Sequence, residues 1–144
     1  MYEFLQRTTP VDSHDFGVSG RIAWAIYCYN AGRTAKDEGD RAKAITILKE
    51  GILAFPFPLT LELLGECLLL EEKPVEATVY LAAAIGMNDE YKFEQLLLLA
   101  KALFTANDNY VTKIMLNKAI AIKPDQEAEE LLNAVMARLD AANA

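Results

Sequence analysis

The sequence predicts an all-α fold, a right-handed α-solenoid of three helical hairpins closed by a C-terminal helix. The first observation is a repeat, because the small residues Gly32, Gly65 and Ala100 lie 33 and 35 residues apart and the residues that follow each of them recur at the same spacing. The second observation is an apolar helix face in the middle unit, with apolar residues at i, i+4 and i+7. These residues are Ala77, Leu81 and Ala84. A period near 34 residues that contains two helices is typical of a helical solenoid.

The first 19 residues show no sustained periodicity and predict a leader, partly disordered, ahead of a repeat domain over residues 20 to 144. The only histidine, His14, lies in this leader between Ser13 and Asp15. Three adjacent residues of a flexible segment do not converge as a catalytic triad does. We therefore expect His14 to be part of a solvated loop.

The first hairpin is predicted to contain helices over residues 20–38 and 41–55. Gly39 is a typical C-terminal stop for the first helix, and Asp40 is a typical N-cap for the second. Pro56 then ends the second helix, because proline cannot continue it.

The second hairpin spans residues 59–84, with the polar break Glu71–Pro74 between its helices. Gly65 lies among leucines, where a glycine is destabilising by about 1 kcal/mol relative to alanine. Such a glycine indicates that another helix packs close to it.

The third hairpin is predicted over residues 91–106 and 109–122, with the turn at Asn107 and Asp108. Asp125 then caps a closing helix that is apolar on one face only, as the end of a soluble stack requires. That face consists of Leu131, Leu132, Val135 and Leu139.

Three stretches carry a family resemblance: GRTAKDEGDRAKAITILKEGILAFP, GECLLLEEKPVEATVYLAAAIGMND and AKALFTANDNYVTKIMLNKAIAIKP. In register, they make the chain resemble the tetratricopeptide repeat (TPR) family over roughly residues 24 to 124, plus the closing helix. The resemblance implies that the first helix of each hairpin lines a concave groove that binds peptides or partner helices. Residues assigned to this groove are Ile26, Tyr29, Arg33 and Lys36 in the first hairpin, Leu59, Glu62, Glu66, Leu69 and Leu70 in the second, and Glu94, Leu97, Lys101 and Phe104 in the third.

The groove is expected to expose apolar side chains. The helices that line it are apolar nearly all round, so Leu69, Leu70 and Leu97 are predicted to face outward together with Phe104. An exposed apolar patch is typical of a binding surface. The alternatives are that the leader or a second subunit covers these residues.

Acidic residues are expected at the rim of the groove. Glu62, Glu66 and Glu94 favour a ligand with lysine or arginine beside apolar anchors, and an amphipathic helix meets both demands. The alternative is that these glutamates form a solvated acidic face.

The resemblance also implies a test for one class of ligand. Co-chaperone members of the family hold a C-terminal carboxylate with lysine, arginine and asparagine side chains. The corresponding positions are Tyr29, Arg33, Leu63, Glu94 and Leu98. Only Arg33 suits an acidic ligand, so an acidic tail of the Hsp70 or Hsp90 type is disfavoured.

Composition excludes several classes of partner. A net charge of −7 disfavours binding to nucleic acid or to anionic membranes. Most of this charge lies over residues 58–100, which carry eight acidic residues against two lysines. Cys28 and Cys67 belong to no metal-binding motif and predict two buried, reduced thiols. No signal peptide or membrane span is apparent, and we expect a soluble, cytoplasmic protein.

No catalytic, cofactor-binding or metal-binding constellation is apparent. The sequence therefore predicts a non-enzymatic interaction module that binds an apolar or amphipathic segment with some basic residues. Two alternatives stay open. The chain is similar to the small acidic TPR chaperones of bacterial secretion systems, and it is also suited to be a structural subunit of a homodimer or larger homo-oligomer.

Overall fold

Residues 17–143 are described by the structure, a computed structural model, and form helices with no strand among them. The helices are α2 (Gly17–Asp37), α3 (Arg41–Ala54), α4 (Pro58–Leu70), α5 (Pro74–Gly86), α6 (Phe93–Thr105), α7 (Asn109–Ile122) and α8 (Gln126–Asn143). Helix α2 begins three residues before the predicted start. Residues 1–16 of the predicted leader, including His14, lie outside the described part.

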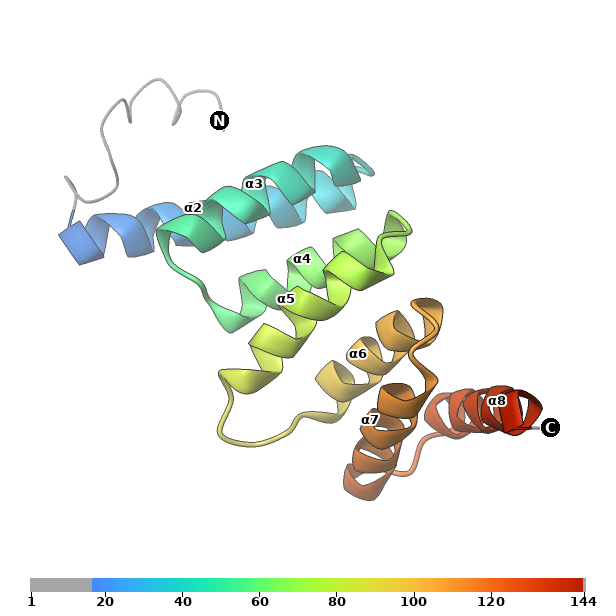
Figure 1. Ribbon diagram of the computed structural model, residues 1–144. Coiled ribbons are helices and arrows are strands. Elements are labelled where there is room, and N and C mark those ends of the chain that lie inside the picture. Colours follow the sequence, from blue (N-terminus) through green and yellow to red (C-terminus); the bar gives the residue numbers. More distant parts are fainter. Residues whose placement is uncertain (1–16, 144) are drawn as a thin grey trace.

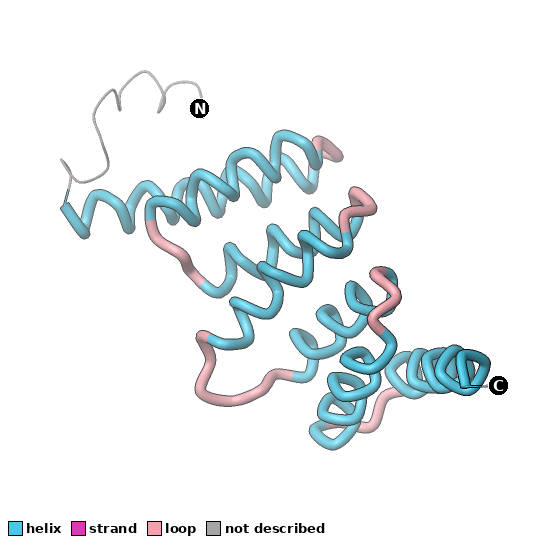
Figure 2. Tube along the Cα trace, viewed as in Figure 1, coloured by secondary structure: helices cyan, strands magenta, loops and turns pink. Residues whose placement is uncertain are grey.

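Three antiparallel hairpins stack side by side, α2 with α3, α4 with α5, and α6 with α7, and α8 closes the end of the stack (Figure 1). The tube view shows the short turns within the hairpins along one side of the stack and the connections between hairpins along the opposite side (Figure 2). The predicted α-solenoid with a closing helix is therefore confirmed. None of the described helices is long and apolar enough to cross a membrane.

The turn inside each hairpin has the same backbone geometry. Gly39, Glu72 and Asn107 each have a positive φ, at 85°, 60° and 64°. In each case this residue and the next donate their amide hydrogens back to carbonyls of the preceding helix, as in a Schellman motif. Glycine and asparagine adopt this conformation readily, whereas a glutamate does so at a cost.

Aspartate caps begin the second helices of the outer hairpins, as predicted for Asp40. Its side chain accepts a hydrogen bond from the amide of Lys43 at 3.1 Å, and Asp108 accepts one from the amide of Val111 at 3.4 Å. Helix α5 begins instead with Pro74 in its first turn, where a missing N–H costs nothing.

The core forms two clusters along the stack. One extends from α2 to α6 and includes Leu48, Leu64 and Leu81. The other joins α6, α7 and α8 around Leu96, Leu116 and Val135. Ala77, Leu81 and Ala84, the apolar face predicted from the spacing, are all buried.

The first helices form a continuous row. Helix α2 contacts α4, α4 contacts α6, and α6 contacts α8. Helices α3 and α5 each pack against the first helix of the next hairpin, and α7 packs against the closing helix α8. A cleft remains between α5 and α7. The stack is thus tighter on the side of α2, α4 and α6, the side on which the sequence predicted the groove. We call this side the first-helix face.

Candidate binding surface

The exposed apolar residues of the first-helix face are fewer than the sequence predicted. Ile26, Leu59 and Leu70 have exposed fractions of 49%, 62% and 48%. Ile26 of α2 and Leu59 of α4 are one repeat apart on helices that contact each other, so their side chains share one region of the face. Apolar surface in that region is the feature that a partner can bury.

Two of the leucines expected to face outward do not. Leu97 is only 8% exposed and belongs to the second core cluster, and Leu69 is partly buried against the first. The prediction of an open strip of leucines was therefore wrong for Leu97 and only partly right for Leu69. The cause lies in α8, whose residues complete the cluster that contains Leu97.

Helix α8 also engages the other groove residues predicted on α6. Lys101 forms an ion pair with Glu127 of α8. The guanidinium carbon of Arg138 lies 3.5 Å from the centroid of the Phe104 ring, and its Nη1 donates to the Phe104 carbonyl at 2.8 Å. A stacked guanidinium of this kind stabilises the contact electrostatically as well as by burial. The third hairpin thus contributes mainly Glu94, which is exposed, to the accessible surface.

Polar contacts link neighbouring first helices across the face. Lys36 of α2 pairs with Glu66 of α4 at 2.8 Å. Glu62 of α4 accepts a hydrogen bond from Gln95 of α6 at 3.1 Å. These predicted groove residues therefore also hold the hairpins together. The hydrogen bond to Glu66 favours the charged form of Lys36 and therefore raises the pKa of Lys36.

Arg33 and Glu94 are the exposed charges among the predicted groove residues, and Tyr29 is partly buried against the first core cluster. Neither Arg33 nor Glu94 has an ion-pair partner within residues 17–143. A bound segment would meet these charges beside Ile26 and Leu59.

The two cysteines lie inside the fold. Cys28 and Cys67 are free thiols, both fully buried, as predicted. Burial raises the pKa of Cys28 to about 12, with a further contribution from the carboxylate of Glu50, and burial also raises the pKa of Cys67. Nucleophilic chemistry needs a thiolate, so both thiols are poor nucleophiles. In the described part of the chain no three His, Cys, Asp or Glu side chains group together as metal ligands.

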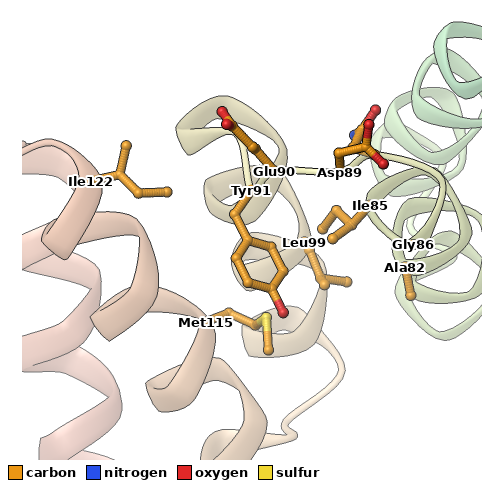
Figure 3. Close-up of a pocket in the computed structure, with 10 residues that line it drawn as sticks. Ala82, Ile85, Gly86, Asp89, Glu90, Tyr91, Leu99, Met115 and Ile122 are labelled. Atoms are coloured by element: carbon orange, nitrogen blue, oxygen red, sulfur yellow. The ribbon is translucent and has the colours of Figure 1, made fainter.

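A second concave feature, missed by the sequence reasoning, lies between α5 and α7. This cleft of about 730 Å³ has Leu99 of α6 and Met115 of α7 in its wall. In Figure 3 the Tyr91 ring points toward Met115, whereas the carboxylate of Glu90 points away from it. Its lining includes Tyr91 and Ile122, apolar side chains that are 55% and 49% exposed.

Solved structures with a similar arrangement include TPR domains. The first TPR domain of Spaghetti (RPAP3), bound to the HSP90 peptide SRMEEVD, matches with a TM-score of 0.71 and 18% identity over 83% of this chain and 98% of that one. The chain has the TPR fold. The second TPR domain of human RPAP3, in complex with the HSP70 peptide SGPTIEEVD, matches equally well, with a TM-score of 0.71 and 18% identity over 83% of this chain and 98% of that chain.

A fungal TPR domain is also similar. The Sgt2 TPR domain from Aspergillus fumigatus has a TM-score of 0.70 and 17% identity over 83% of this chain and 81% of that chain. The sequence itself matches no known family profile and no curated protein. The likeness to TPR domains is therefore a likeness of fold.

Proposed function

We propose that the chain is a non-enzymatic protein-interaction module whose first-helix face binds an apolar or amphipathic segment with some basic residues. The observation that carries this proposal is the pair of exposed aliphatic side chains, Ile26 and Leu59, on adjacent helices. Glu62 lies one turn after Leu59 on α4, and the exposed Glu94 occupies on α6 the repeat position of Leu59. A bound segment with an apolar anchor residue and a neighbouring lysine or arginine would complement these aliphatic and acidic side chains.

Two of the solved relatives carry acidic peptides, and the residues of this chain do not favour such a ligand. Of the five clamp positions, Leu63 is 9% exposed and lies in the core, and Leu98 packs against it. Glu94 would repel the carboxylates of such a tail, which leaves Arg33 as the only cation. The shared fold therefore supports peptide binding in general, and the side chains support a different peptide.

A peptide library displayed on phage and panned on the full chain tests the proposal. We expect enriched sequences to pair an aliphatic residue with a nearby lysine or arginine. The substitution Leu59→Glu should weaken binding of an enriched peptide by at least about tenfold, because it replaces apolar burial with an unpaired charge. Leu53 is a matched control, since it is a leucine 86% exposed on α3, away from the face.

Fluorescence anisotropy with an enriched peptide gives the affinities, and circular dichroism checks that each variant is folded. If Leu59→Glu and Leu53→Glu bind the peptide equally well, the first-helix face is not the site. Enrichment of acidic C-terminal sequences would also contradict the proposal, because it would indicate a carboxylate clamp that these side chains do not form.

Self-association is a second candidate function, favoured by exposed apolar residues on the second helices. Val75 and Val79 of α5 and Tyr110 of α7 are 69%, 63% and 73% exposed. A homodimer through this side would bury them. Light scattering over a concentration series would show a mass that rises with concentration in the native chain and stays monomeric in Val79→Glu; a constant monomeric mass in both would dismiss it.

The alternative that the chain is a secretion chaperone has less support once burial is considered. Such a protein needs a broad apolar surface for export substrates, and the burial of Leu97 and Leu69 reduces that surface on the first-helix face. The exposure of Leu59 and Ile26 supports binding of one short segment instead.

A further inference from the structure

A buried amide lies behind the first-helix face. Gln95, the third residue of α6, is 5% exposed in a helix that is otherwise almost wholly apolar on its buried side. A buried amide is costly unless its donors and acceptor find partners. Gln95 finds them at both ends of its side chain.

The hydrogen bonds of Gln95 connect two elements. Its Nε2 donates to Oε2 of Glu62 on α4 at 3.1 Å, and its Oε1 accepts from Nδ2 of Asn88 at 2.6 Å. Asn88, in the connection between α5 and α6, is itself fixed by a second bond, from Nδ2 to the carbonyl of Ala84 at 3.2 Å. Asn88 therefore sets the orientation of the Gln95 amide, because a flipped amide would place its Nε2 donor against the Nδ2 donor of Asn88.

The repeat itself does not require an amide here. The equivalent positions of the other two first helices are occupied by Tyr27 and Thr60. Thr60 is fully buried, and its hydroxyl has no hydrogen-bond partner among the described residues. The fold therefore accommodates unlike side chains at this position, including one whose polar group is unpaired. Gln95 differs from them in that it holds a carboxylate of the proposed binding face.

We propose that Gln95 is a specificity-determining positioning residue that holds Glu62 as the docking point for a basic side chain of the bound segment. This inference rests on the proposed function. It adds that Glu62 pairs with the lysine or arginine of the bound segment and that Gln95 holds Glu62 in place. A carboxylate held in place before binding loses less conformational freedom when a lysine or arginine pairs with it. The lysine or arginine of the bound segment would then lie about one helical turn of α4 away from Leu59.

A double-mutant cycle between protein and peptide tests the proposal. The peptide is the tightest basic sequence enriched on the native chain, and its partner peptide has norleucine in place of the critical lysine. The protein variant is Gln95→Met, which keeps a side chain of similar length and removes the amide. We expect the native chain to prefer the lysine peptide by about tenfold and Gln95→Met by about twofold, with equal affinity of both proteins for the norleucine peptide.

Two further variants separate positioning from folding. Asn88→Ala leaves Gln95 in place but removes the bond that orients it, so the preference for lysine should also fall. Gln126→Met is the matched control, because Gln126 is an exposed glutamine on α8 that bonds only to Glu130 among the described residues, at 2.9 Å. It should keep the full preference.

The outcomes are distinct. If Gln95→Met weakens both peptides equally, its role is structural and the inference is wrong. If the preference for lysine is unchanged in Gln95→Met, Glu62 is not positioned by Gln95 and the inference is wrong as well. If nothing is enriched on the native chain, or the enriched peptides carry no base, the proposed function itself fails at that earlier step.

Discussion

Gly65 of α4 and Leu81 of α5 are in such close contact that a Cβ atom on Gly65 would lie 2.4 Å from Cγ of Leu81. Gly32 and Leu48 have the same relation in the first hairpin, at 2.6 Å. The glycine that sequence analysis assigned to a close helix–helix approach is thus where the two helices of the hairpin touch. In the third hairpin the equivalent position is Ala100 instead of a glycine. The closest contact between the two helices therefore differs there from the first two hairpins.

This contact predicts that Gly65→Ala destabilises the chain. Overpacking costs about 1–3 kcal/mol, and a Cβ this close to a branch carbon belongs in the upper part of that range. The cost therefore exceeds the roughly 1 kcal/mol that alanine gains in helix propensity. Urea denaturation would measure the difference. Gly86→Ala is the control, because nothing lies within 4 Å of its Cβ position, and it should be neutral or slightly stabilising. In a Leu81→Ala background Gly65→Ala should lose its penalty; an undiminished penalty there would rule out the clash with Leu81 as its cause.

Glu72 is predicted to be a site where glycine improves stability. Its φ of 60° is left-handed, and this conformation costs a residue with a Cβ about 1–2 kcal/mol. Glu72→Gly should therefore raise the free energy of unfolding by about 0.5–1 kcal/mol after the entropy of glycine is counted. Glu72→Ala removes the same charge but keeps the Cβ. A gain in Glu72→Ala as large as that in Glu72→Gly would assign the effect to charge.

The buried thiols predict a loss of stability at alkaline pH. Burial raises the pKa of Cys28 to about 12 in the folded chain, whereas an unfolded cysteine has a pKa of about 8.5. Between these two pKa values the thiol of the unfolded chain ionises whereas the buried thiol stays protonated, so ionisation favours the unfolded state. The stability present below pH about 8.5 therefore declines as pH rises toward about 12. Urea unfolding at pH 8 and pH 10.5 should show a smaller decline for Cys28→Ala than for the native chain. Equal declines would assign the effect to other groups.

Leu97 and Leu70 are predicted to respond differently to a glutamate. Leu97 is 8% exposed, so Leu97→Glu buries an unpaired charge and should destabilise by about 3 kcal/mol or more. Leu70 is 48% exposed, and Leu70→Glu should change stability by about 0.5 kcal/mol or less. Thermal unfolding monitored by circular dichroism gives both values. A well-folded Leu97→Glu would mean that α8 does not cover this residue.

The order and type of the helices could be predicted because small residues recur at the repeat spacing and turn and capping residues mark the helix ends. Gly65, Gly39 and Asp40 each have one structural use, and the structure has them in that use. Exposure was harder to predict, because α4 and α6 are apolar on almost every side. Periodicity alone does not show which leucine α8 will cover, so Leu97 was misplaced.

Gln95 was missed for the opposite reason. A single polar residue in an amphipathic helix is typical of a solvated surface, and only the placement of Asn88 and Glu62 shows that this one is buried and bonded at both ends. The interaction depends on residues 7 and 33 positions away. Such a relation is tertiary and leaves no local pattern.

Helix α8 covers the last hairpin of the stack. It occupies the place that the first helix of a fourth hairpin would take, and it satisfies Lys101 and Phe104 without offering a comparable apolar edge beyond itself. A chain cut before Gln126 would leave the apolar side chains around Leu97 uncovered, and we expect such a chain to self-associate. Exchanging α8 for another hairpin would instead lengthen the spiral by one unit.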